Sequence, residues 1–152
     1  MYGRRYNLHD FVRFYFNPRN AFLYPNQNNH GDNIIILIFY ADQLLCDLQT
    51  DFIFADRNAT TDDCQFYFDF EGLCQIDWEQ VKMKFWTQYG IQYKETMHKM
   101  QAETCVLKRV GMEHLASICC LTNRAKEEVG KITRQFKGRN FNVEIAQNLY
   151  FP

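Results

Sequence analysis

The sequence feature that most constrains the fold is an aromatic run that stops at an asparagine–proline pair. Residues Asp10-Phe-Val-Arg-Phe-Tyr-Phe16 are mostly aromatic or β-branched, which favours an extended strand. Asn17 is a good helix N-cap, and Pro18 is a good first helical residue because its missing N–H costs nothing there. The pattern therefore predicts a strand followed by a short helix that ends near Tyr24.

The rest of the chain predicts short strands separated by helices. Apolar runs and alternating segments indicate the strands, whereas capping residues before apolar periods indicate the helices. Strands are predicted at 34–39, 52–54, 102–110, 118–121 and 141–145, helices at 44–48, 77–86 and 123–136, and loops at 25–32 and 56–63. Residues 87–100 have no clean period, and Asn123 is the predicted cap of the last helix. This order indicates a mixed α/β or α+β domain.

The length of the chain fits one ordinary hydrophobic core. A chain of 152 residues is too short for two comfortable domains, so a single domain over residues 1–152 is predicted. No apolar stretch approaches the ~20 residues of a membrane span, and the longest, Ile34–Phe39, has strand length. No secretory signal is recognised at the N-terminus, so a cytoplasmic protein without a membrane partner is expected.

The six cysteines show neither a CxxC pair nor a histidine at zinc-finger spacing. Buried, reduced thiols are therefore expected, and no metal is predicted. The cysteines are Cys46, Cys64, Cys74, Cys105, Cys119 and Cys120.

Charge is distributed unevenly along the chain. Residues 42–79 hold ten acidic residues and the single base Arg57, whereas residues 94–152 hold ten Lys and Arg against six acids. The basic part is compatible with a polyanionic ligand, although solvated charged faces are common.

Four segments together resemble the DarT family of DNA ADP-ribosyltransferases. Leu8-His-Asp-Phe-Val-Arg-Phe-Tyr-Phe-Asn-Pro-Arg-Asn-Ala-Phe-Leu-Tyr24 resembles its His-Asp-Tyr-Val-Pro-Phe-Tyr-Phe-x-Pro-Arg-x-x-Met-Leu-Tyr pattern. Phe52-Ile-Phe-Ala-Asp-Arg57 is similar to its Phe-x-Phe-Thr-Asp-Arg turn, and Ile76-Asp-Trp-Glu79 to its Asp-Trp-Glu helix start. Gln101-Ala-Glu-Thr-Cys-Val106 is similar to its Gln-Ala-Glu-Phe-Leu-Val strand. Order and spacing agree up to Tyr150.

The resemblance implies an α+β ADP-ribosyltransferase-like domain with a mixed sheet and flanking helices. Relatives carry several tens of residues before the first of these segments, including a His-x-Thr strand that holds the nicotinamide ribose. The domain is therefore expected to be partial and N-terminally truncated in this chain.

Glu103 is the catalytic residue that the resemblance implies. Transfer of ADP-ribose from NAD passes through an oxocarbenium-like transition state, which a carboxylate near the ribose stabilises. The same carboxylate is expected to assist proton removal from the acceptor base. The alternative is a solvent-facing strand residue, and the Gln-Ala pair before Glu103 favours the catalytic interpretation.

Three residues of the first segment are candidates for binding NAD. Tyr15 and Tyr24 occupy positions where these transferases place aromatic rings near the nicotinamide. Arg19, next to a predicted helix N-terminus, suits a diphosphate. Core packing for the tyrosines and a surface role for the arginine stay open. Phe14 and Phe16 point to the opposite face of the strand and are expected in the core.

Residues 93–100 correspond to the family's substrate-recognition loop, which implies contacts with single-stranded DNA. Lys94, His98 and Lys99 are candidates for phosphates and Tyr93 for stacking on a base, with a solvated charged loop as the alternative. Asp63 falls where relatives can have a substrate-site histidine.

Three functions remain open at this stage. The first is NAD-dependent mono-ADP-ribosylation of a base in single-stranded DNA, with the chain acting as a toxin opposed by a macrodomain antitoxin. The second is a catalytically inactive DarT-like module that binds nucleic acid or another partner. The third is an ADP-ribosyltransferase that acts on RNA or protein, which the divergent recognition loop, with Met97 where relatives often have arginine, keeps open.

Overall fold

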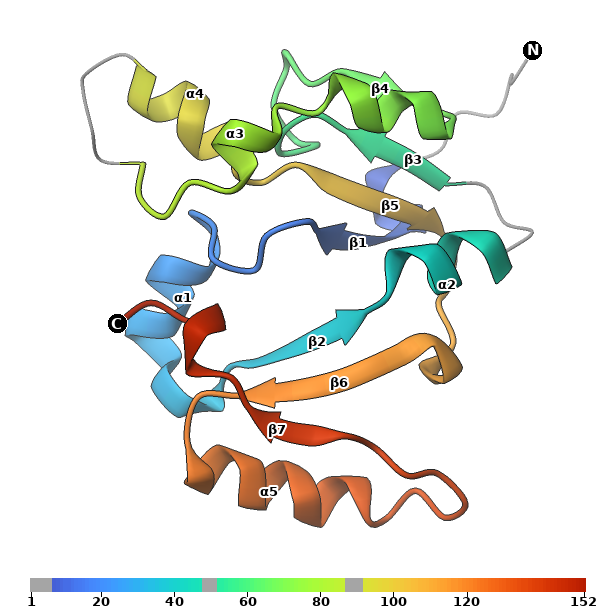
Figure 1. The fold of residues 1–152 in the computed structure, drawn as a ribbon, viewed down its shortest axis with the longest axis vertical. Helices are drawn as coiled ribbons and strands as arrows, with labels where there is room; N and C mark the ends of the chain where they lie inside the picture. The colour runs from blue at the N-terminus through green and yellow to red at the C-terminus, as the bar shows by residue number, and fades with distance from the viewer. Residues whose placement is uncertain (1–6, 48–51, 87–91) are drawn as a thin grey trace. The chain divides into compact units, whose positions relative to one another are not determined.

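The computed structural model describes residues 7–47, 52–86 and 92–152 (Figure 1). The chain forms two compact units. The first unit draws on Met1–Asn17 and Leu48–Val110, and the second on Pro18–Asp47 and Gly111–Pro152. Each contains its own sheet and helices, in keeping with the α+β class. A single domain over residues 1–152 stays a prediction.

The first unit is built on a four-stranded antiparallel sheet. Its strands run in the order β1 (Phe11–Tyr15), β5 (Glu103–Leu107), β3 (Phe52–Ala55) and β4 (Phe66–Tyr67). The predicted strands at 10–16, 52–54 and 102–110 are confirmed. The short strand β4 is not predicted, because two residues are too few to show an alternating pattern.

One face of this sheet is an aromatic core. Phe54 is fully buried, and its ring centroid lies 5.2 Å from Phe52, 6.3 Å from Phe16 and 6.2 Å from Phe70. Phe16 also contacts the Trp78 ring edge-on at 5.1 Å and packs against buried side chains of the first unit. The core position predicted for Phe16 is therefore confirmed. Because side chains alternate along β1, the opposite face of the sheet carries a different set of residues.

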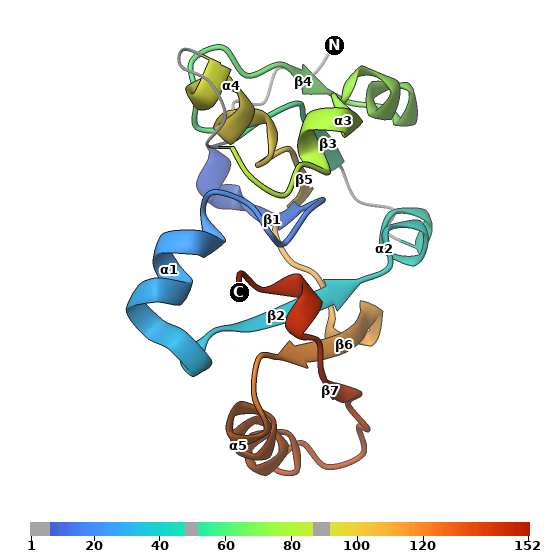
Figure 2. The same ribbon diagram turned by 60° about the vertical axis from the view of Figure 1, so that its left-hand side comes forward.

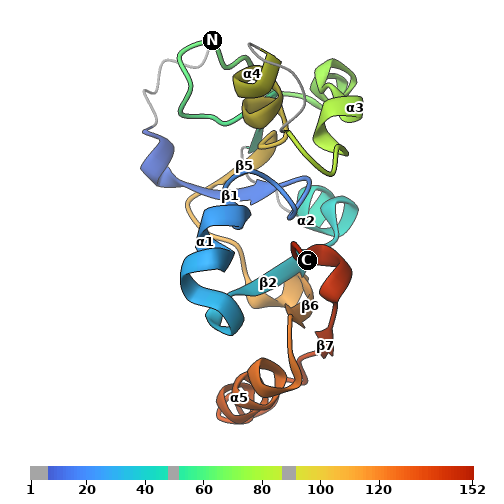
Figure 3. The same ribbon diagram turned by 90° about the vertical axis from the view of Figure 1, so that its left-hand side faces the viewer.

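Two helices lie between β4 and β5 along the chain, α3 (Trp78–Val81) and α4 (Gln92–Lys99), and they lie side by side (Figure 3). The Asp77 side chain caps α3 as predicted, accepting from Gln80 N at 3.2 Å. The predicted extension of this helix to residue 86 is wrong. The Asn17 amide donates to the carbonyl of Val81 at 2.6 Å, an acceptor that another helical turn would need. Part of the segment without a clean period forms α4; residues 87–91 lie outside the described residues.

The second unit contains a mixed three-stranded sheet. β2 (Ile35–Phe39) pairs antiparallel with β6 (Leu115–Cys120), which pairs parallel with β7 (Val143–Ile145). These strands were predicted from their apolar runs and alternation. α5 (Asn123–Thr133) connects the two parallel strands and packs along β7 (Figure 2).

Capping in the second unit differs from the prediction. Thr122, rather than Asn123, caps α5, because its hydroxyl accepts from Ala125 N at 3.2 Å and donates to an Asp32 carboxylate oxygen at 2.9 Å. α2 (Ala41–Asp47) confirms the helix predicted through Leu44, while Leu48 lies outside the described residues.

The helix predicted directly after Pro18 is wrong. α1 spans Leu23–His30, across most of the predicted loop. The Asn20 side-chain oxygen accepts from Phe22 N at 2.9 Å and from Leu23 N at 3.1 Å, so Asn20 satisfies the helix start. Pro25 is tolerated because it lies in the first turn, where backbone N–H groups have no helical partner. Gly31, with φ of 52°, ends the helix.

Replacing Tyr150 by phenylalanine should lower the free energy of unfolding by about 1–2 kcal/mol. The Tyr150 side chain is almost fully buried, and its hydroxyl lies 2.7 Å from the Cys119 carbonyl and 3.2 Å from the Ile34 carbonyl. The substitution leaves these two acceptors without their donor. Chemical denaturation measures the loss, and the exposed Tyr40→Phe variant is the matched control. Equal stability of both variants would contradict the prediction.

Candidate active site

Glu103 lies at the start of β5 with its carboxylate completely screened from solvent. Three donors hold the carboxylate. Arg13 Nε donates to Oε2 at 2.7 Å, Arg13 Nη2 donates to Oε1 at 2.6 Å, and the backbone N–H of Ala59 donates to Oε1 at 2.8 Å. The guanidinium and the backbone N–H fix the position of the carboxylate and complement its charge. The site can therefore hold a fixed negative charge.

Arg13 reaches Glu103 because both side chains lie on the same face of the sheet. In the β1–β5 register Tyr15 stands opposite Glu103, and Arg13 stands two residues along the strand, opposite Cys105. The ion pair is bidentate, and the Arg13 side chain is 28% exposed. The hydrogen bond to Glu103 raises the pKa of Arg13, and the Glu103 charge adds to this against the opposing effect of burial.

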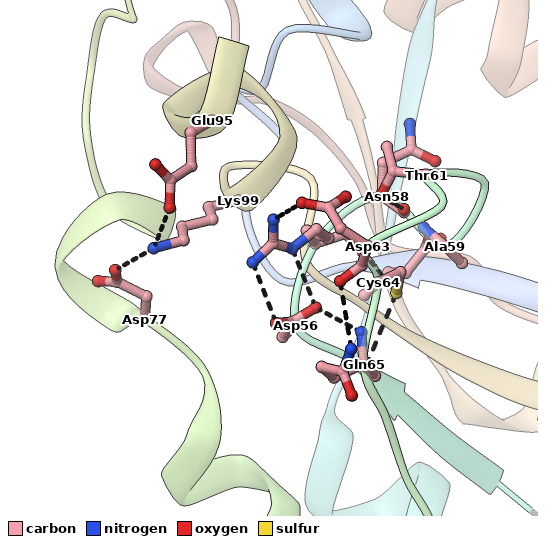
Figure 4. Close-up of polar contacts among 12 residues, drawn as sticks. Asp56, Asn58, Ala59, Thr61, Asp63, Cys64, Gln65, Asp77, Glu95 and Lys99 are labelled. Atoms are coloured by element: carbon pink, nitrogen blue, oxygen red, sulfur yellow. Dashed lines mark hydrogen bonds and ion pairs between the residues drawn. The ribbon is translucent and has the colours of Figure 1, made fainter. Parts of the chain in front are cut away.

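The loop after β3 supplies the third donor and is anchored by Asn58. The Asn58 side-chain oxygen accepts from Arg13 Nη2 at 3.3 Å and from Thr60 N at 3.0 Å. Its amide donates to Gln101 Oε1 at 2.8 Å, and its backbone N–H donates to the His98 carbonyl at 3.0 Å. Asn58 therefore connects the loop to β1, to the residues before β5 and to the end of α4. The close-up in Figure 4 shows this loop.

A second set of contacts, made by Arg57 and Asp56, fixes the same loop. The Arg57 guanidinium forms ion pairs with Asp56 and Asp63. Asp56 also accepts from Gln65 N at 3.0 Å and donates its own N–H to the Gln65 carbonyl at 3.2 Å. The Asp63 side chain, predicted at the substrate site, is 64% exposed, and its partner in this structure is Arg57.

Tyr15 is the predicted NAD-binding residue that the sheet places beside Glu103. It is half-buried and stands opposite Glu103 in the register. Burial raises its pKa, as does the negative charge of Glu103, while Arg13 acts in the opposite direction. Tyr15 is therefore a neutral phenol next to the ion pair.

Arg19 and Tyr24, the other two predicted NAD-binding residues, belong to the second unit and meet at Phe151. The Arg19 guanidinium carbon lies 5.3 Å from the centre of the Phe151 ring, and the Tyr24 ring approaches that ring edge-on at 5.3 Å. Phe151 is held by Gln27, whose side chain pairs with both its N–H and its carbonyl, at 2.9 and 2.8 Å. The aromatic tail therefore orders both residues.

The predicted DNA-binding residues lie on α4. Lys99 is held between the carboxylates of Asp77, at 3.2 Å, and Glu95, at 3.0 Å (Figure 4). The Tyr93 hydroxyl accepts a hydrogen bond from Trp86 Nε1 at 3.1 Å. The remaining two candidates are the exposed Lys94 and the half-buried His98. The ion pairs with Asp77 and Glu95 hold the Lys99 side chain within the first unit.

The thiols should differ sharply in reactivity. Burial raises the pKa of Cys64 to about 11 and that of Cys105 to about 12, whereas Cys74 is exposed. The thiolate is the reactive form, so at pH 8 the native chain should be alkylated at Cys74 at least ~100-fold faster than at Cys64 or Cys105. Peptide mass spectrometry after timed iodoacetamide treatment measures the rates. Equal rates in the native state, rather than only after denaturation, would contradict the prediction.

Arg13, Asn58 and the Ala59 N–H are the parts of the site that sequence reasoning missed. The sequence does carry a signal for Arg13, because it is a basic residue in an otherwise apolar strand. It lies two residues before Tyr15, and therefore on the same face of the strand, at a position where the family pattern has proline. Asn58 carries no such signal, because asparagine is ordinary in a turn.

Within the described ranges, no group of three or more His, Cys, Asp or Glu side chains is arranged to hold a metal ion. In the same part of the chain, no helix has the length and apolar character needed to cross a membrane.

A family comparison matches residues 2–151 to the family described as "ssDNA thymidine ADP-ribosyltransferase, DarT". The chain is also 31% identical over 150 residues to a DNA ADP-ribosyl transferase of Thermus sp. (strain 2.9). That alignment covers 95% of this chain and 70% of the relative.

Solved structures of a DarT protein are also similar to this chain. The fold is similar to Thermus sp. 2.9 DarT in complex with NAD+, with a TM-score of 0.84, 30% identity, and coverage of 95% of this chain and 74% of that chain. It is equally similar to the same protein in complex with ADP-ribosylated ssDNA, with a TM-score of 0.84 and 31% identity, covering 95% of this chain and 70% of that chain.

Proposed function

Because the chain belongs to the DarT family of single-stranded-DNA thymidine ADP-ribosyltransferases, we propose that it transfers ADP-ribose from NAD to thymidine in single-stranded DNA. Structures of one relative, Thermus sp. 2.9 DarT, in complex with NAD+ and with ADP-ribosylated ssDNA support this substrate pair.

The observation that carries the proposal is the anchored carboxylate of Glu103. The residue lies on β5, within the Gln-Ala-Glu segment that resembles the family strand, and three donors hold its carboxylate in place. A fixed anion stabilises positive charge far better than a mobile one, because no reorganisation is needed during the reaction. Glu103 is therefore suited to a transition state that resembles a ribosyl cation.

The reaction exchanges one C–N bond for another and transfers one proton. The bond between ribose C1′ and the nicotinamide nitrogen breaks, and its electron pair leaves with nicotinamide. The ring nitrogen of thymine bonds to C1′ and loses its proton, for which Glu103 is the proposed acceptor. Glu103 thus has two roles in the proposal, stabilising charge on the sugar and removing the proton of the base.

NAD binding is assigned to Tyr15, Arg19 and Tyr24. Tyr15 lies beside Glu103 in the register, which suits a ring near the nicotinamide end of NAD. Arg19 and Tyr24 are ordered together by Phe151, and a guanidinium suits the diphosphate.

DNA binding is assigned to α4 and the loop after β3. Lys94 and His98 are the proposed phosphate contacts, and Tyr93 is the proposed stacking residue. Lys99 and Asp63 have protein partners, so DNA must compete with Asp77 and Glu95 for Lys99 and with Arg57 for Asp63. Their contribution to DNA affinity is accordingly proposed to be the smaller one.

The biological setting follows from the chemistry. Modification of thymidine blocks base pairing, so such an activity is toxic in a cell that copies its DNA. We propose a cytoplasmic toxin opposed by a macrodomain antitoxin that removes the ADP-ribose.

The test is incubation with NAD and single-stranded oligonucleotides that place one thymidine in each possible neighbour context. The expected result is one added ADP-ribose group on a subset of oligonucleotides, measured by mass spectrometry, with release of nicotinamide. Matched oligonucleotides with cytidine in place of thymidine should gain none. No adduct with any oligonucleotide and no nicotinamide release would overturn the proposal.

The complete burial of the Glu103 carboxylate favours one second candidate, a non-catalytic module that binds nucleic acid. The same experiment separates the two functions when oligonucleotide binding is also measured. Binding without an adduct supports the module, and an adduct excludes it.

A further inference from the structure

We propose that Arg13 is a positioning residue for the transfer reaction, which fixes the direction of the Glu103 carboxylate through a bidentate ion pair. The inference rests on the proposed function.

The two carboxylate oxygens of Glu103 are not equivalent. Oε1 accepts two hydrogen bonds, at 2.6 Å from Arg13 Nη2 and at 2.8 Å from Ala59 N. Oε2 accepts one, at 2.7 Å from Arg13 Nε. Each carboxylate oxygen has about two lone-pair sites, so Oε1 is saturated by its two donors, while Oε2 is held in place by Arg13 Nε.

Arg13 is also a charged neighbour of Glu103. Among the described residues, Tyr15 on β1, Cys105 on β5 and Cys64 in the loop after β3 also interact with Glu103 electrostatically. All three are neutral near pH 7, because burial raises the pKa of each. Arg13 therefore supplies the positive charge that pairs with Glu103.

The guanidinium is itself oriented by the loop. Its Nη2 atom also donates to Asn58 Oδ1 at 3.3 Å, and Asn58 is bonded to Thr60 and Gln101. Arg13 therefore holds the carboxylate in a direction that β1 and the loop define together. A lysine at this position would keep the charge but lose the planar, bidentate geometry.

The first measurement tests the pair itself and needs no activity. Arg13→Gln should lower the midpoint of thermal unfolding by about 10 °C, because it leaves a buried charge without its partner. The double variant Arg13→Gln/Glu103→Gln should recover most of this loss. If the single and double variants unfold at the same temperature, the two side chains are not coupled and the inference fails.

The second measurement tests the role in the reaction, using transfer from NAD to the thymidine oligonucleotides at a temperature where the unfolding curves show each variant to be folded. Arg13→Gln should lower kcat about 100-fold, because the carboxylate loses the guanidinium that fixes its position. In Arg13→Lys kcat should also fall, because lysine keeps the charge but loses the bidentate geometry. A merely structural role would leave kcat of the folded variants unchanged.

The outcomes separate the two proposals. Transfer by the unaltered chain together with an unchanged kcat in folded Arg13→Gln would overturn the inference alone. If the unaltered chain transfers nothing, the proposed function is overturned, and the reaction role of Arg13 with it, whatever the unfolding measurements show.

Discussion

Replacing Glu103 by glutamine should lower the rate of ADP-ribose transfer at least about 1000-fold, since both charge stabilisation and proton removal are lost. Glutamine keeps the size of the side chain and an oxygen that can accept from the Ala59 N–H, so the fold of the sheet is expected to survive. Initial rates of adduct formation, measured by mass spectrometry at saturating NAD, give the effect on kcat.

The matched control is Glu127→Gln on the exposed surface of α5, which removes one carboxylate from the second unit. This control should transfer at the rate of the unaltered chain. A Glu103→Gln variant that retains more than a tenth of the rate, while unfolding as a single cooperative species, would show that Glu103 is not the catalytic carboxylate.

The largest stability effect is expected at Phe54. Truncation to alanine should lower the free energy of unfolding by about 3–5 kcal/mol, because the ring is fully buried and contacts Phe16, Phe52 and Phe70. Truncation also removes packing from β3, which pairs with β5, so the candidate active site should become less rigid. Chemical denaturation followed by tryptophan fluorescence measures the change, since Trp78 lies in the same cluster.

Phe68→Ala is the control for this prediction. Phe68 is 70% exposed and follows the short strand β4 in the same unit, so its truncation should change stability by no more than about 0.5 kcal/mol. If the two variants lose similar stability, the aromatic face of the first sheet is not the core of that unit.

Most strands were predictable because their patterns are local. Alternation placed Phe16 in the core, and the apolar run at 34–39 marked β2. α1 was not predictable in this way, because Leu23 is its only buried residue among those described. Its stability comes instead from Asn20 at its start and from Gln27, which pairs with Phe151 far along the chain.

The candidate active site was likewise only partly predictable from local sequence patterns. Glu103 was identified from its neighbours in sequence, through the resemblance to the family strand. Its principal partner, Arg13, is 90 residues away, and only the pairing of β1 with β5 brings them into contact. Asn17, the predicted helix cap, instead donates its side-chain amide to the Val81 carbonyl, 64 residues away in sequence. Local rules propose such partners, and the tertiary structure selects among them.

The alternation along β1 also restricts how this segment can vary in length. Arg13 and Tyr15 share a face with Glu103, while Phe16 packs into the aromatic core on the opposite face. Inserting or deleting one residue within the strand would exchange these two sets, placing a guanidinium in the core and a phenylalanine at the carboxylate. Homologous chains should therefore differ here by substitution only, and any change of length should fall before Phe11 or after Asn17.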